Sequence, residues 1–143
     1  MNREEILAME PGKELDKLVA MHVMGWSIYH YDKDVPERCY YMLVDSGLDP
    51  VADDEPWSWS NGERTTEEAA WEDNKPWSTD ISAAWEVVNM ITDKAERNGC
   101  GPCVELAHDG TWHMKIGTAR AVGTAPEAIC KAALLYKLAE SHA

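Results

Sequence analysis

The segment from Ser78 to Gly99 constrains the fold more than any other part of the chain. Its first three residues carry side-chain oxygens suited to capping a helix. The residues that then recur on one helical face are Ile81, Ala84, Trp85, Val88, Ile91, Thr92 and Ala95. Asn98-Gly99 is typical of a helix end. The sequence therefore predicts a long amphipathic helix that directs Trp85 into the core.

Three short segments after this helix, VELAH, WHMKIG and ARAVG, are separated by turn residues and predict an antiparallel meander. The first loop sets the register. A two-residue Asp109-Gly110 turn would place His108 and His113 on one face but would split the apolar residues between faces. A three-residue loop, Asp109 to Thr111, puts the apolar residues of both strands on one face and sends His113 to the other. We favour the three-residue loop.

Further helices are predicted on both sides of these elements. One short helix is expected over Arg3 to Met9, and an amphipathic helix follows from Pro11 to Gly25. Thr124-Ala-Pro-Glu127 is a capping-box sequence that begins a helix running nearly to the C-terminus. The segment RCYYMLV, residues 38–44, could add a strand. This order predicts an α+β fold, with a sheet covered by helices.

Length and charge restrict the function. The 143 residues suit one domain, 1–143, and the absence of a long apolar run or an export signal predicts a soluble cytoplasmic protein without membrane contact. The net charge of −13 argues against binding to duplex nucleic acid. The region at about 45–80 is expected to be mostly loop, with eleven acidic residues against Arg64 and Lys75.

The tetrapeptide CGPC, residues 100–103, has the letters of a thioredoxin active site. Such a pair normally follows a strand and begins a helix, whereas here it follows a helix and leads into a strand, so a dithiol redox role is disfavoured. Cys100, Cys103, His108 and His113 also approach a zinc-knuckle spacing. In neither strand register do both histidines share a face with Cys103 unless that cysteine precedes the strand, so we assign no metal ligand.

Aromatic residues in the acidic region are the candidate binding groups. Trp57, Trp59 and Trp77 lie in it, and Tyr41 precedes it. Their rings could stack on a ligand, or could anchor the loop as a small satellite core, which is the commoner outcome. Arg64 is the arginine of this region and suits a bidentate contact with a phosphate or carboxylate. No catalytic residue or cofactor site is predicted, because no enzyme motif is present.

The blocks LAMEPGKELDKLVAMHVMGW, PWSTDISAAWEVV and TAPEAICKAALL resemble the phage ABA-sandwich domain family, small proteins of bacteriophages and prophages. The resemblance covers most of the chain. It implies an α/β/α sandwich, with helices on both sides of a small antiparallel sheet. It implies no activity, because the family has no known function and no defined catalytic motif. The CGPC segment and the acidic region with its tryptophans look particular to this chain.

The leading hypothesis is a homo-oligomeric, non-enzymatic phage accessory protein. It would bind and sequester a small nucleotide-like host molecule, an immune signal, as an anti-defence protein, through Trp57, Trp59, Arg64, Trp77 and Tyr41. One alternative is an acidic protein that masks a basic host protein by imitating nucleic acid. The other is a structural zinc-binding or CGPC thiol-redox protein.

Overall fold

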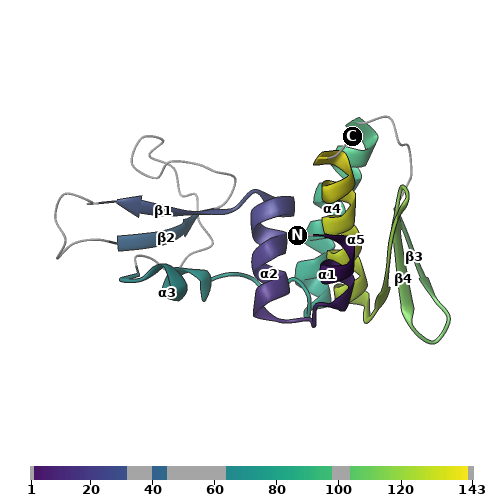
Figure 1. Cartoon of the computed structure of the whole chain (residues 1–143), viewed down its shortest axis with the longest axis horizontal. Coiled ribbons are helices and arrows are strands. Elements are labelled where there is room, and N and C mark those ends of the chain that lie inside the picture. The colour runs from purple at the N-terminus through teal and green to yellow at the C-terminus, as the bar shows by residue number, and fades with distance from the viewer. Residues whose placement is uncertain (1, 32–39, 45–63, 98–103, 142–143) are drawn as a thin grey trace. The chain divides into compact units, whose positions relative to one another are not determined.

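The computed structural model describes residues 2–31, 40–44, 64–97 and 104–141. The chain divides into two compact units, one formed by residues 1–23 with 75–143 and the other by residues 24–74. We call them the larger unit and the inserted unit. Across both units the described residues form helices and two small antiparallel sheets, so the predicted α+β fold is confirmed (Figure 1). The single-domain organisation over 1–143 stays a prediction.

The three-stranded sheet of the larger unit has the predicted register. Its strands are β3 (Val104–His108), β4 (Trp112–Ile116) and β5 (Ala119–Gly123), in that order. His108 pairs with Trp112, so a three-residue loop joins β3 to β4. Met114 and Ile116 are buried on one face, and His113 lies on the other. The alternation of apolar residues along the strands therefore predicted the β3–β4 register correctly.

Helix α5 (Ala125–Ser141) is the central element of the larger unit. It packs on β4 and β5 and also contacts α4 (Ile81–Arg97), α1 (Arg3–Ala8) and α2 (Lys13–Val19) (Figure 1). Contacts on several sides bury every residue from 128 to 135. The predicted capping box begins this helix: Glu127 N donates to Thr124 Oγ1 and Thr124 N donates to Glu127 Oε1, both at 3.4 Å.

Helix α4 forms where predicted, but its buried face differs from the prediction. Asp80 Oδ1 caps it by accepting from Ser82 N at 2.8 Å. Among the described side chains of this helix, the buried ones are Ala83, Ala84, Val87 and Ile91. Ala84 and Ile91 belong to the expected stripe, whereas Ala83 and Val87 do not. Ile81 is 42% exposed and Trp85 is 49% exposed, so the assignment of Trp85 to the core was wrong. The expected and observed faces therefore overlap. The buried face carries the small residues Ala83 and Ala84, which allow close approach of a neighbouring helix, and α4 contacts α5.

The N-terminal helices also match the sequence in outline. Asn2 and Glu5 form a capping box at α1. Helix α2 begins at Lys13, after Pro11 and Gly12, and its chain continues as a π-helical segment, Ala20–Met24, up to Gly25, whose φ of 77° suits glycine. Within the described residues, no helix is long and apolar enough to cross a membrane.

A buried carboxylate joins the start of α2 to the turn before α4. Asp16 Oδ1 accepts hydrogen bonds from Ser78 N and Ser78 Oγ, both at 2.7 Å. Gly12 N donates to the same hydroxyl at 2.9 Å. Burial raises the pKa of Asp16 above its ordinary value of 3.8, although both hydrogen bonds from Ser78 act in the opposite direction. The carboxylate is therefore an ordered link between two segments distant in the sequence.

This raised pKa predicts a pH dependence of stability. The folded state holds the Asp16 proton more tightly than the unfolded state, so the contribution of Asp16 is greatest below pH 3.8 and declines as the pH rises through the folded pKa. Urea titrations of the wild type and Asp16→Asn at a series of pH values measure this effect. The free energy of unfolding of the wild type minus that of the variant should decrease as the pH rises over that window. Glu14→Gln, an exposed carboxylate on the same helix, is the control and should give no such trend. A flat difference for Asp16→Asn would contradict the assignment.

The inserted unit contains elements that the sequence did not reveal. Strand β1 (Ser27–Tyr31) pairs antiparallel with β2 (Tyr40–Val44), and only β2 was anticipated. A short helix, α3 (Glu67–Trp71), lies within the region expected to be mostly loop and contacts both strands. Thr66 Oγ1 caps it by accepting from Ala69 N at 3.1 Å.

Candidate functional site

The candidate site begins with a row of three side chains across the sheet of the inserted unit. His30 on β1 pairs with Tyr41 on β2, and Tyr41 in turn pairs with Arg64 through two backbone hydrogen bonds of 2.7 and 2.8 Å. Residues directly opposite in antiparallel pairs project from the same face. The His30 and Tyr41 rings are stacked, with centroids 4.3 Å apart and planes within 5°. The fold thus places an aromatic pair beside an arginine.

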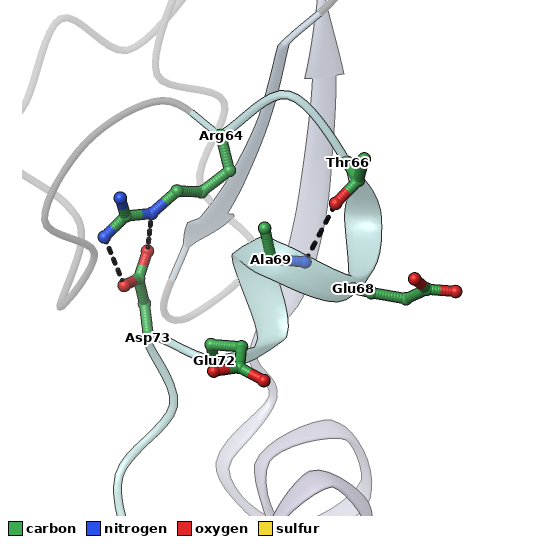
Figure 2. A pocket seen from close by; sticks show the side chains of 6 residues that line it. All are labelled: Arg64, Thr66, Glu68, Ala69, Glu72 and Asp73. Atoms are coloured by element: carbon green, nitrogen blue, oxygen red, sulfur yellow. Dashed lines mark hydrogen bonds and ion pairs between the residues drawn. The ribbon is translucent and has the colours of Figure 1, made fainter.

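Arg64 is held in a bidentate ion pair. Its Nε donates to Asp73 Oδ2 at 2.9 Å and its Nη2 donates to Asp73 Oδ1 at 2.7 Å (Figure 2). The hydrogen bonds and then the charge of Asp73 raise the pKa of Arg64. The sequence predicted that Arg64 suits a bidentate contact with a phosphate or carboxylate, and the carboxylate that it contacts here is the protein's own Asp73. Ligand binding by Arg64 stays a prediction.

A hollow of about 490 Å³ opens beside this pair. It is lined by Arg64, Thr66, Glu68, Ala69, Glu72 and Asp73 (Figure 2). Three carboxylates and one guanidinium give this lining a formal charge of −2. Its volume is in the range of small-molecule sites. A surface of this charge accepts hydrogen bonds from amino, hydroxyl or cationic groups and repels phosphate.

The predicted binding residues that the structure describes belong to both units. Tyr41 and Arg64 lie next to each other, as described above. Trp77 belongs to the larger unit and is completely buried, so its ring cannot stack on a ligand in this conformation. Trp57 and Trp59 lie outside the described residues. For these two residues, ligand binding stays a prediction.

The lining residues Glu68, Glu72 and Asp73 were not selected from the sequence. A local excess of carboxylates usually indicates a solvated surface, so the acidic residues of this region were not distinguished from one another. The signal that could have found them is the Thr66 cap, which predicts a helical turn over the following residues. His30 was missed because strand β1 was missed.

Cys100 and Cys103 lie outside the described residues, so the redox alternative stays a prediction. For the zinc alternative, the structure describes only the two histidines of the proposed spacing. His113 lies on the opposite face of the sheet from His108, which pairs with Trp112. His113 Nε2 lies 2.7 Å from Asp109 Oδ1. The hydrogen bond from His113 lowers the pKa of Asp109, and this effect exceeds the opposing effect of desolvation. Among the described residues, no three acidic, histidine or cysteine side chains form a metal-binding group.

These features define a small α+β protein whose described residues form a hollow of about 490 Å³. A family model for the phage ABA sandwich domain matches residues 17–134. The chain therefore belongs to the phage ABA sandwich domain family, and the resemblance of its helical blocks to this family is confirmed. The family has no known function. No curated protein and no solved structure matches the chain.

Proposed function

We propose that this chain is a non-enzymatic phage accessory protein that binds and sequesters a small nucleotide-like host molecule in the hollow beside α3. The observation that carries the proposal is the hollow of about 490 Å³, because its lining combines the Arg64 guanidinium with carboxylate and hydroxyl groups that form hydrogen bonds. Arg64 also pairs with Tyr41, whose ring stacks on His30, although neither aromatic side chain lines the hollow. In this proposal the protein acts against host defence in the host cytoplasm, where sequestration removes an immune signal. Membership of a phage family supports a role in a phage and nothing more specific.

The charge of the hollow defines which part of such a molecule it recognises. Glu68 and Glu72 accept hydrogen bonds, so they suit the amino groups of a base or the hydroxyl groups of a ribose. Arg64 is already paired with Asp73, and a phosphate would have to displace that carboxylate. We therefore place the base and sugar, and not the phosphate, against α3.

Direct binding measurements test this proposal. Isothermal titration calorimetry of the full chain, with nucleosides and their mono-, di- and cyclic nucleotides, should show that phosphate adds no affinity. Glu68→Gln should weaken binding about tenfold or more, because a hydrogen bond to a charged group contributes about 1.5–3 kcal/mol. Its matched control is Glu67→Gln, an exposed neighbour that does not line the hollow.

Three results would contradict the placement of the ligand in this hollow. They are no binding of any nucleoside, a strict requirement for phosphate, or equal effects of the two glutamine variants. A further variant, Asp73→Asn, removes one negative charge beside Arg64. It should shift the preference toward nucleotides over nucleosides, because the guanidinium is then less completely neutralised.

A second candidate function, the masking of a basic host protein, is favoured by the charge of −2 in the hollow. Exposed Glu67 extends this acidic surface beyond the hollow. A hexa-arginine peptide is the probe for this alternative, in the same calorimetric experiment. Binding of the peptide but not of nucleosides, with a loss in Glu68→Gln, would favour masking over sequestration of a small molecule.

A further inference from the structure

The sheet of the larger unit has one face that α5 does not cover. Alternation along the strands places two rows of side chains on it, while Met114 and Ile116 point to the buried face. The first row is Glu105, Lys115 and Arg120, paired strand to strand. The second is Ala107, His113 and Val122.

The charged row contains two cations side by side. Lys115 and Arg120 are direct cross-strand partners, and like charges in that position are destabilising. Glu105, opposite Lys115 on its other side, leaves the row with a net formal charge of +1. Neither cation makes an ion pair with another side chain in the part of the chain that the structure describes. Two unpaired cations are notable in a chain with a net charge of −13, which offers abundant carboxylates.

The second row adds apolar surface next to the cations. Val122 is 48% exposed, and Ala107 is also exposed. Removal of such area from water contributes about 25 cal/mol per Å² to association. The face therefore combines a charged row of net formal charge +1 with an apolar strip, which suits a carboxylate-bearing protein surface.

We propose that this face of the β3–β5 sheet docks on the acidic side of α3 in a second copy of the chain. Glu67 and Glu68 on α3 are exposed and make no ion pair within the described residues, so they complement Lys115 and Arg120. Repulsion between two chains of like net charge opposes the contact. At physiological salt, screening over about 8 Å reduces that repulsion, so charges at the contact decide the outcome.

The contact joins two different surfaces, so it is heterologous and assembles copies head to tail. It goes beyond the proposed function, because it does not depend on which host molecule occupies the hollow. It shares Glu68 with the hollow, however, so a second copy and a host ligand compete for that side chain. A monomeric variant with changes only in the sheet face should retain ligand binding.

Sedimentation velocity over a concentration series tests the proposal. The wild-type chain should self-associate, and Arg120→Glu should weaken the association at least tenfold. The matched control is Arg3→Glu, which makes the same charge change at another exposed arginine and should leave association unchanged. Circular dichroism melting curves confirm that each variant is folded.

A charge-swap experiment gives the decisive result. Lys115→Glu/Arg120→Glu and Glu67→Lys/Glu68→Lys should each lose self-association alone, and an equimolar mixture of the two should associate again. A wild-type chain that remains monomeric would overturn the proposal, as would equal effects of Arg120→Glu and Arg3→Glu or a mixture that stays monomeric. A monomeric wild-type chain that binds nucleosides would leave the proposed function intact.

Discussion

Replacement of Trp77 with alanine is expected to lower the free energy of unfolding by about 3–5 kcal/mol, the range for removal of a large buried aromatic ring. Trp77 has no exposed surface and is the largest of the fully buried side chains. Lys75 Nζ lies 5.6 Å from its ring centroid, so a cation also covers the ring. Urea-induced unfolding of the full chain, followed by circular dichroism, measures the loss.

Trp85→Ala is the matched control for this experiment. It removes the same side chain only eight positions further along, but Trp85 is 49% exposed on α4. A surface substitution of this kind usually changes stability by less than about 0.5 kcal/mol. Equal losses in the two variants would contradict the observed burial. A larger loss of stability for Trp85→Ala than for Trp77→Ala would indicate that Trp85 lies in the core, as the helical periodicity predicted.

The two tryptophans also show what periodicity can decide. The pattern from Ser78 to Gly99 located α4 correctly, because caps and apolar spacing are local signals. It could not choose between two overlapping stripes, since that choice depends on α5, which lies far along the chain. Trp77 precedes the helix, and its burial comes from tertiary packing that no helical pattern encodes.

The three-stranded sheet was predictable in detail for a physical reason. Its loops are short, so loop length and alternation together leave few registers, and only the three-residue loop gave one apolar face. The inserted unit offers no such constraint. Tyr41 pairs with Arg64 across a long separation in sequence, and α3 is a single helical turn with a solvated acidic face. Individual site residues could be proposed there, but their neighbours could not.

The buried lysine of α5 provides the second large expected effect. Lys131 lies in the run of buried residues from 128 to 135 and is 4% exposed. Its Nζ donates to Glu127 Oε2 at 2.7 Å and to the Leu7 carbonyl oxygen at 3.0 Å. Lys131 therefore neutralises the Glu127 carboxylate on its own helix. It also donates a hydrogen bond to the Leu7 carbonyl, which lies in the last turn of α1 and so has no hydrogen-bond donor within α1.

Lys131→Met should lower the free energy of unfolding by about 3–5 kcal/mol, because removal of one member of a buried ion pair leaves the other charge uncompensated. Methionine has a similar length, so the loss comes mainly from Glu127 and the Leu7 carbonyl and not from a cavity. Urea unfolding measures the effect. Hydrogen exchange should also become faster in α1, since the contact with Leu7 is lost.

A double variant separates charge from packing in this interaction. Glu127→Gln keeps an oxygen for the Thr124 amide but removes the charge that Lys131 neutralises. In Lys131→Met/Glu127→Gln no uncompensated carboxylate remains, so the combined loss should be smaller than the sum of the two single losses. Additive losses would show that the ion pair contributes no coupling. The stability of α5 would then rest on its apolar contacts with the sheet and the other helices, and Lys131 would serve only to hold α1 through the Leu7 carbonyl.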